Sequence, residues 1–302
     1  MKYRKFGSTD LDVSEIGFGG WAIGGGAHGN SYGPTDDQES RRAIAAAFDL
    51  GCTFFDTADV YGHGHSEELL GEILQGKRDK VVIATKGGSD FYHEPPRLNF
   101  TEGHLFMAVE ESLRRLRTDY LDLYQLHNPP FSLIEAGHLF EPLEKLKAQG
   151  KIRHYGISIH DPQEGLLALK VGHPVSIQVV YNYLRRDAAE ELFPRALAEG
   201  VAIIAREPLA NGFLTGKYTK DSIFPMGDIR HQWPSKYQAQ LINRVQEYLK
   251  ATASSPFPPA QTALRFVLAQ PAVSVVIAGC KTVHQVEENL RTSDLALHAS
   301  SR

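Results

Sequence analysis

Eight short apolar segments alternate with amphipathic segments along almost the whole chain, and this alternation restricts the fold more than any other feature. The apolar segments, which we predict to be strands, are residues 15–19, 53–56, 80–86, 121–127, 154–158, 176–181, 201–206 and 274–278. In the third of them, the run from Val81 to Ala84 is apolar without alternation, which is typical of a strand covered on both faces.

The amphipathic segments between these strands are predicted to be helices. They are residues 36–50, 66–74, 101–116, 140–149, 162–171, 187–199 and 259–270, with a last helix from near Val283. Strand–helix alternation predicts a parallel sheet with helical crossovers, and eight units favour a closed (β/α)8 TIM barrel over an open sheet. We expect residues 1–302 to form this one domain, with residues 1–14 as a β-hairpin that caps the bottom of the barrel.

Composition and charge exclude several classes of protein. The formal net charge is −4 and Lys and Arg form no tract, so neither nucleic acid nor a membrane surface is an expected partner. The two cysteines, Cys52 and Cys280, imply no disulfide framework, and we expect Cys52 to be buried. No segment resembles a signal peptide or a membrane span, so we expect a cytoplasmic protein. The sequence does not indicate the oligomeric state.

Two long loops, residues 87–100 and 216–234, are expected to overhang one end of the barrel, because long loops often carry function. They contain His93, Arg97, Arg230 and His231, which suggest a polar or anionic substrate.

Polar side chains stand at the ends of three neighbouring strands. Asp56, Lys86 and His127 each end an apolar segment, and Tyr61 follows Asp56 in the next loop. Because barrel enzymes place their chemistry at the carboxyl ends of the strands, we expect these four side chains to converge. Each alone is more often structural, as an ion pair, a cap or a packing residue, but the combination favours a functional site.

The combination has a specific chemical interpretation. A phenol with a pKa of about 10 is a weak acid at neutral pH, but an ammonium about 4 Å away contributes roughly 4 kcal/mol, or about three pKa units. Lys86 is therefore expected to lower the pKa of Tyr61, with Asp56 holding Lys86 in place. His127 could orient a carbonyl oxygen by a hydrogen bond. This arrangement suits carbonyl reduction or alcohol oxidation with a nicotinamide hydride.

Several segments carry a family resemblance. Residues 56–67, DTADVYGHGHSE, match the pattern D-x-A-x-x-Y-G-x-x-x-S-E. The match continues in Lys86 and in LYQLH (123–127), GKIRHYGIS (150–158), PLANGFLTGK (208–217) and QVEENL (285–290). Together these segments, in this order, resemble the aldo-keto reductases.

The resemblance implies a (β/α)8 barrel that binds NADP(H), less often NAD(H), without a metal ion. It implies a catalytic set of Asp56, Tyr61, Lys86 and His127, and a substrate pocket of Trp21, Tyr61 and His127, for a small carbonyl or alcohol compound. The implied cofactor contacts are Gly20, Trp21 and Asp56; Ser158 and Gln178 at the carboxamide; Arg206 at the nicotinamide ring; Pro208, Leu209, Asn211 and Lys217 at the pyrophosphate; and Gly279, Lys281, Gln285, Glu288 and Asn289 at the adenosine phosphate.

General chemistry supports part of the adenosine end. Gly279 allows close approach of a phosphate, and the helix after Thr282 is expected to present free N–H groups to an anion. Lys281 could pair with a 2′-phosphate, which favours NADP(H) over NAD(H). Two positions depart from the family's common pattern: Ile159 replaces an Asn, and Arg206 replaces an aromatic ring, although a guanidinium can also stack.

Alternatives remain open. Residues 17–22, GFGGWA, fit a dinucleotide fingerprint, but the glycines that follow oppose the helix which that motif must open. Lys86 could form a Schiff base, although a neighbouring Asp56 would keep it charged. His63 and His65 could bind a metal ion, but an exposed loop is the simpler reading. The chain could also be a regulatory subunit that senses the nicotinamide redox state.

Overall fold

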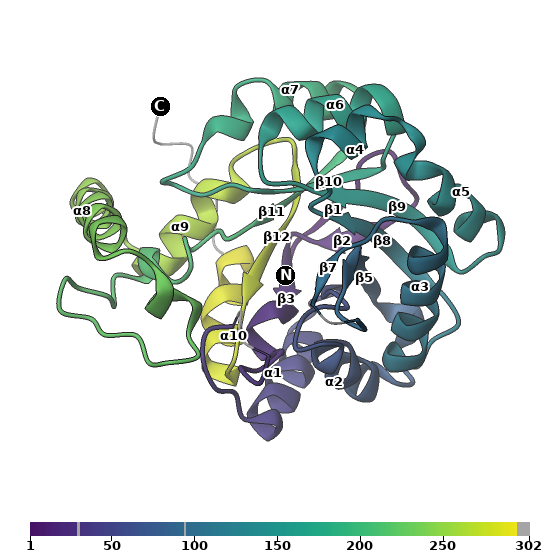
Figure 1. Ribbon diagram of the computed structural model, residues 1–302. Helices are drawn as coiled ribbons and strands as arrows, with labels where there is room; N and C mark the ends of the chain where they lie inside the picture. Colours follow the sequence, from purple (N-terminus) through teal and green to yellow (C-terminus); the bar gives the residue numbers. More distant parts are fainter. Residues whose placement is uncertain (29–30, 94, 295–302) are drawn as a thin grey trace.

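Eight parallel strands close into a barrel, as predicted. The computed structural model describes residues 1–28, 31–93 and 95–294. The barrel strands are β3 (Ile16–Gly19), β4 (Phe54–Asp56), β5 (Val82–Gly87), β8 (Leu121–His127), β9 (Ile152–Ser158), β10 (Ser176–Val180), β11 (Ala202–Arg206) and β12 (Val273–Gly279). They follow one another around the barrel in sequence order, and β12 pairs with β3 to close it (Figure 1).

Alternation along each strand divides the core into an inner and an outer part. In β5, Val82 and Ala84 belong to the cluster inside the barrel, whereas Ile83 packs among the helices outside it. Each strand is therefore covered on both faces, which accounts for the apolar run that ends at Ala84.

An N-terminal hairpin fills the bottom of the barrel, also as predicted. Strands β1 (Tyr3–Lys5) and β2 (Asp12–Ser14) pair antiparallel. The buried side chains of Phe6, Leu11 and Val13 join the inner cluster, where the ring of Phe6 stacks on Phe54 with centroids 5.6 Å apart. The hairpin thus supplies the apolar groups that exclude water from the bottom of the barrel.

The predicted helices surround the barrel. They are α1 (Asp37–Asp49), α2 (His65–Leu74), α3 (Glu102–Leu116), α5 (Glu141–Ala148), α6 (Pro162–Gly172), α7 (Leu192–Ala198), α9 (Pro259–Leu268) and α10 (Val283–Leu290). Local signals explain two of the starts: Asp36 caps α1, and Asp161 with Glu164 forms a capping box on α6. The predicted helix 187–199 is divided, because Pro194 has no N–H to donate and fits only in the first turn of α7.

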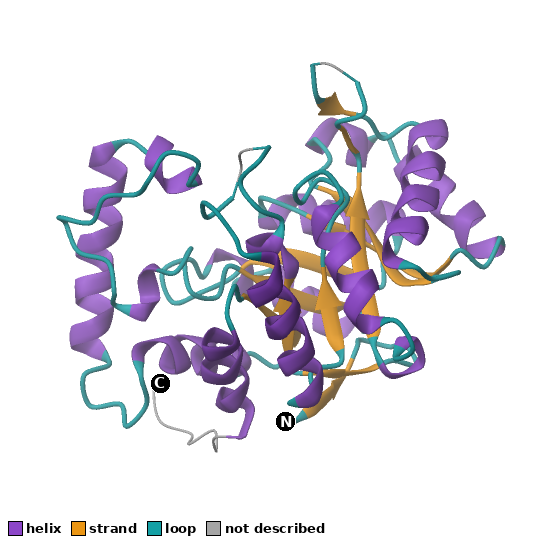
Figure 2. Cartoon of the chain, turned by 90° about the horizontal axis from the view of Figure 1, so that it is seen from below, coloured by secondary structure: helices purple, strands orange, loops and turns teal. Residues whose placement is uncertain are grey.

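Three further pieces were not expected. Helix α8 (Ser235–Ala251) lies at the side of the barrel in Figure 1. Its apolar face packs against the loop after β11, in a separate cluster with Phe213 and Leu214. A short helix, α4 (Phe131–Glu135), follows β8. The loop 87–100 contains a hairpin of β6 (Ser89–Asp90) and β7 (Arg97–Leu98), which projects beyond the barrel strands in Figure 2.

Among the described residues, no helix combines the length and the apolar character needed to cross a bilayer.

Candidate active site

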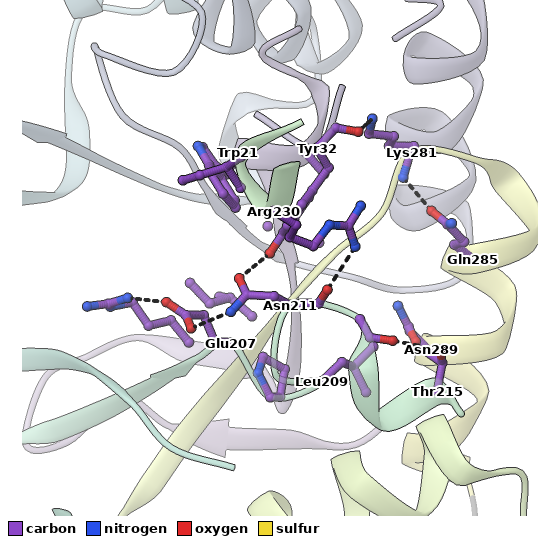
Figure 3. Close-up of a pocket in the computed structure, with 18 of the residues that line it drawn as sticks. Trp21, Tyr32, Glu207, Leu209, Asn211, Thr215, Arg230, Lys281, Gln285 and Asn289 are labelled. Atoms are coloured by element: carbon purple, nitrogen blue, oxygen red, sulfur yellow. Dashed lines mark hydrogen bonds and ion pairs between the residues drawn. The ribbon is translucent and has the colours of Figure 1, made fainter. Parts of the chain in front are cut away.

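A large pocket opens at the carboxyl ends of the barrel strands. Its volume is about 1160 Å³, and its lining comes from the ends of β3, β4, β8, β10, β11 and β12 and from the loops that follow them. One end of the pocket contains Asp56, Tyr61 and His127, and the other contains Lys281, Gln285 and Asn289. Figure 3 shows Tyr32, Asn211 and Arg230 between Trp21 and Lys281.

Lys86 forms a buried ion pair with Asp56 behind the first end of this pocket. Strands β4 and β5 are neighbours in the barrel, and Asp56 lies opposite Ala84, which is two residues before Lys86 and on the same inner face of β5. The Lys86 Nζ atom donates to Asp56 Oδ1 at 2.6 Å and to the Thr57 carbonyl at 2.8 Å, and it lies 3.3 Å from the Tyr61 hydroxyl. The second oxygen of Asp56 accepts from Gln178 Nε2 at 2.8 Å and from Gln125 Nε2 at 3.3 Å. Side chains of β8 and β10 thus fix the carboxylate, in addition to Lys86 from β5.

Tyr61 and His127 face each other across the pocket. Their rings meet edge to face with centroids 5.8 Å apart, and both residues line the cavity. Gly62, with φ +63°, turns the chain directly after Tyr61, and a side chain there would collide with the Gly24 carbonyl. This close approach of two loops fixes the position of Tyr61. The structure therefore brings together all four residues that end or follow the strands.

The expected lowering of the Tyr61 pKa was wrong in direction. Burial raises the pKa of Tyr61 above 10, and this effect exceeds the opposing effect of Lys86, while Asp56 raises it further. The main physical reason is desolvation, because the buried hydroxyl would lose the water that stabilises a phenolate; Asp56, 2.6 Å from the ammonium, offsets part of the effect of Lys86 as well. In this state Tyr61 is a neutral phenol throughout the physiological pH range.

The charges of Lys86 and His127 follow from their surroundings. Burial disfavours the charged form of Lys86, but Asp56 and Tyr61 outweigh it and raise the pKa, so Lys86 is cationic. This opposes the Schiff-base alternative, which needs an uncharged amine. Burial, together with Lys86 and Arg206, holds the pKa of His127 well below 6.5, so its imidazole is neutral. Its Nδ1 atom is buried and has no partner among the described residues.

Of the three residues expected at the nicotinamide, two line the pocket and one does not. Gln178 lines the pocket, and among the described residues its side chain forms hydrogen bonds through Nε2, which donates to Asp56 and Gln125. Arg206 also lines the pocket, and its guanidinium donates to the Ile159 carbonyl at 3.0 Å and to Glu207 at 2.6 Å. Ser158 does not line the cavity, because it is buried and its hydroxyl donates to Asn128 at 3.0 Å.

The loop after β11 forms the middle of the pocket with a strained backbone. The predicted residues Pro208, Leu209, Asn211 and Lys217 all line the cavity. Glu207, Ala210 and Asn211 have φ between +46° and +57°, a conformation that L residues seldom adopt. Such strain persists only where surrounding contacts enforce it, and it is common at ligand sites.

Gly279, Lys281, Gln285, Glu288 and Asn289, which the resemblance assigns to the adenosine phosphate, all line the far end of the pocket. Two of the expectations there need correction. The first N–H groups of α10 are not all free, since Val283 N–H donates to the Glu39 carboxylate and Gln285 N–H to Thr282. Lys281 does not present a bare ammonium, because its Nζ atom donates to three backbone carbonyls.

The residues after β3 behave largely as expected. Trp21 forms part of the pocket wall, but Gly20 does not line the pocket. A Cβ atom on Gly20 would lie 2.7 Å from the Ser66 hydroxyl, so this glycine permits close packing of two loops. A single 3₁₀ turn, Gly20–Ile23, follows β3 where a dinucleotide fingerprint would need a long helix.

The basic residues of the two long loops all have partners within the protein, and the suggestion of a polar or anionic substrate stays a prediction. His93 and Arg97 pair with Asp90 at 2.9 and 3.5 Å. His231 lies 2.8 Å from the Phe224 carbonyl, and Arg230 pairs with Asp228 at 2.6 Å. Only Arg230 of the four lines the pocket.

The two histidines near Tyr61 also have structural contacts. His63 stacks between His28 and Phe91, and His65 pairs with Asp37 at 2.9 Å. Cys52 is buried, as predicted.

Several pocket residues escaped the sequence analysis, among them Tyr32, Glu207, Trp233 and Ala22. Tyr32 follows a glycine-rich stretch, and Glu207 stands between two residues that were expected to contact the cofactor, so the sequence held only weak signals for them. Trp233 belongs to the long loop 216–234, which was expected near the site, but only Lys217, Arg230 and His231 of that loop were singled out from the sequence.

Comparison with known proteins decides the family. The sequence profile described as "Aldo/keto reductase family" matches residues 15–301. The chain belongs to this family. It is therefore an oxidoreductase that acts on carbonyl compounds, in a family that binds a nicotinamide cofactor.

Individual relatives cover almost the whole chain of this aldo-keto reductase. "Aldo-keto reductase yakc [NADP(+)]" of Schizosaccharomyces pombe is 34% identical, covering 95% of this chain and 85% of its own. The "NADH-specific methylglyoxal reductase" of Escherichia coli is 30% identical, covering 98% and 95%. Among solved structures, the holo form of aldo-keto reductase AKR11C1 from Bacillus halodurans matches with a TM-score of 0.81 and 33% identity, covering 98% of this chain and 92% of that one.

Proposed function

We propose that this aldo-keto reductase transfers a hydride from NADPH to an aldehyde or ketone, with Tyr61 as the general acid, and catalyses the reverse oxidation of an alcohol. One observation carries the proposal: Lys86 joins a buried carboxylate and the Tyr61 hydroxyl by hydrogen bonds of 2.6 and 3.3 Å at the pocket wall. A phenol beside a fixed ammonium can release its proton to a developing alkoxide.

The size and lining of the pocket support a dinucleotide as its ligand. A volume of about 1160 Å³ exceeds that of common small-ligand pockets, and one cavity includes both Tyr61 and Lys281 in its lining. Lys217 and Lys281 line it and could balance phosphate charge, whereas Arg230 is already paired with Asp228. Gly212 and Gly279 leave room at the wall for close approach. A bound nicotinamide would supply the hydride that reduces the carbonyl carbon.

The protein's own groups would divide the remaining work. Neutral His127, across the pocket from Tyr61, can donate one hydrogen bond to the substrate oxygen and orient it. Tyr61 gives its proton to that oxygen as negative charge develops there. Lys86 stabilises the phenolate that remains, and Asp56 keeps Lys86 charged and in place.

The raised pKa of Tyr61 is compatible with this role. It keeps the phenol protonated and ready to act as an acid, and Lys86 contributes when the phenolate forms.

The choice between NADPH and NADH rests on the basic residues of the pocket. Lys217 pairs with no carboxylate among the described residues, and a phosphate at Lys281 would compete only with neutral carbonyls, so these two lysines support the dinucleotide with the additional phosphate. Because the two relatives described above differ in the cofactor that their names state, both dinucleotides belong in the test.

A panel of aldehydes, ketones and sugars, with NADPH or NADH labelled with deuterium at C4, tests the proposal. We expect oxidation of the reduced cofactor, with deuterium on the carbinol carbon of the product. Cofactor binding without label transfer to any carbonyl compound would contradict it and would favour a regulatory subunit.

A further inference from the structure

The ammonium of Lys281 donates hydrogen bonds to backbone carbonyls rather than to an acidic side chain. Its Nζ atom donates to the carbonyls of Tyr32 at 2.7 Å, Pro34 at 3.1 Å and Gly33 at 3.3 Å. An ammonium has three protons, so these three bonds use its full donor capacity. None of the ion pairs between described residues includes Lys281. The residue that the resemblance assigns to a phosphate thus holds residues 31–34, which we call the bridging segment.

The bridging segment is also attached to the loop after β11. The Tyr32 hydroxyl donates to Asn211 Oδ1 at 2.6 Å, and Ile229 N–H donates to the Ser31 carbonyl at 2.8 Å. The Arg230 guanidinium lies 4.7 Å from the centre of the Tyr32 ring. The segment therefore connects the loops that follow β3, β11 and β12.

These contacts lie across the middle of the pocket. Tyr32 and Asn211 both line it, and their hydrogen bond joins two loops that come from separate parts of the barrel (Figure 3). A dinucleotide that reaches from Tyr61 to Lys281 has to pass this connection. Lys281 contributes to it from the far end.

We propose that Lys281 sets cofactor selectivity by competition: it fastens the bridging segment when NAD(H) is bound and exchanges the carbonyls for the 2′-phosphate when NADP(H) is bound. This inference rests on the proposed function, because it assumes a dinucleotide in this pocket. The ammonium attracts an anionic phosphate more strongly than a neutral carbonyl, because the phosphate carries the opposite charge, so the phosphate displaces the segment. The gain from the phosphate is reduced by the three bonds that are lost.

Competition and a simple phosphate contact differ in what they predict for NADH. NADH has no 2′-phosphate, so a lysine that only binds phosphate is irrelevant to it. If Lys281 fastens the bridging segment, its removal weakens NADH binding too, and NADH leaves faster. For NADPH, removal abolishes the phosphate pair and also weakens binding.

The test compares Lys281→Met with the wild-type protein, both as full chains. Affinities for NADH and NADPH come from fluorescence titration, and dissociation rates from stopped-flow displacement. We expect NADH to dissociate about tenfold faster from Lys281→Met, with weaker binding of both dinucleotides. An unchanged NADH dissociation rate would overturn the proposal. Tyr32→Phe removes only the bond to Asn211, and we expect it to accelerate the dissociation of both dinucleotides by similar factors.

Lys217→Met is the matched control for charge. Lys217 also lines the pocket, but its ammonium lies over the Tyr218 ring, 4.8 Å from the centroid, rather than on the bridging segment. We expect its removal to leave the NADH dissociation rate near the wild-type value. Equal acceleration in both variants would show that charge, not fastening of the segment, controls NADH release, and the proposal would fail.

A cofactor-free measurement separates this proposal from the proposed function. The chain has two tryptophans, and Trp21 meets the Tyr32 ring edge-on with centroids 4.5 Å apart. In a Trp233→Phe background, acrylamide should quench Trp21 more strongly after Lys281→Met but not after Lys217→Met. Equal quenching in all three proteins would contradict the fastening role, whether or not the enzyme turns over. If neither dinucleotide binds the wild-type protein, both proposals fail.

Discussion

Replacement of Lys86 by methionine tests the buried ion pair. Lys86 is fully buried and its Nζ atom lies 2.6 Å from Asp56 Oδ1. Methionine has a similar length but no charge, so Asp56 would remain as a buried carboxylate without its cation. Removal of one partner of a buried pair costs about 3–5 kcal/mol of unfolding free energy. We expect Lys86→Met to lose stability of this order in urea unfolding.

The effect on catalysis has a separate cause. At 3.3 Å and an effective dielectric constant of about 20, the ammonium attracts a Tyr61 phenolate by about 5 kcal/mol, and Asp56 cancels part of it. We therefore expect kcat to fall on the order of 10²- to 10³-fold.

The double variant Lys86→Met/Asp56→Asn separates the two effects. It removes both charges, so we expect it to regain most of the stability that Lys86→Met loses, while kcat stays low because no cation faces the phenolate. Asp56→Asn alone is the control for the altered carboxyl group. Steady-state kinetics and urea unfolding of all four proteins provide the comparison. Recovery of kcat together with stability in the double variant would refute the role of Lys86 as a charge beside Tyr61.

Two further predictions concern the loops around the site. Gly62→Ala places a methyl group 1.9 Å from the Gly24 carbonyl at φ +63°, so it should shift Tyr61 and reduce kcat. The control Gly76→Ala, at φ +77° with open space around it, should cost only about 1–2 kcal/mol of stability. Similar kinetics of the two variants would contradict this prediction. Hydrogen bonds from His93 and Asn99 lower the pKa of Asp90 to about 2 from 3.8, so its stabilising contribution is complete above about pH 4 and is lost as pH falls through 2. Asp90→Asn should lower the urea midpoint at pH 6 and flatten its decline between pH 4 and 2, and an unaltered curve would exclude this contribution.

Most of the barrel could be predicted from the sequence, because each strand is covered on both faces and therefore forms an apolar run. The runs that end at Asp56, Lys86 and His127 are apolar for that reason, and their polar last residues stand out. Helix α8 was missed although Leu241, Ile242, Val245 and Tyr248 have helical spacing, because no strand follows it directly and the expected strand–helix alternation has no place for it. Only the structure shows that its apolar face packs on Phe213 and Leu214 in a loop rather than on the barrel.

Protonation states and hydrogen bonds that depend on residues far apart in the sequence could not be predicted from it. The Tyr61 pKa depends first on the burial of its hydroxyl and then on how closely Asp56 neutralises Lys86, and both require the folded structure. The Val283 N–H group at the start of α10 is occupied by Glu39, which lies in α1 at the other end of the sequence. Lys281 is held by carbonyls of a segment that no local pattern connects to it. In each case the partner is brought near by closure of the barrel.

The Tyr61→Phe variant provides the most direct measurement. The change removes one oxygen and leaves the ring that faces His127. In single-turnover stopped-flow experiments, we expect NADPH to bind with near wild-type affinity while its oxidation by a carbonyl substrate is abolished. Hydride transfer at the wild-type rate without this hydroxyl would show that another group protonates the substrate.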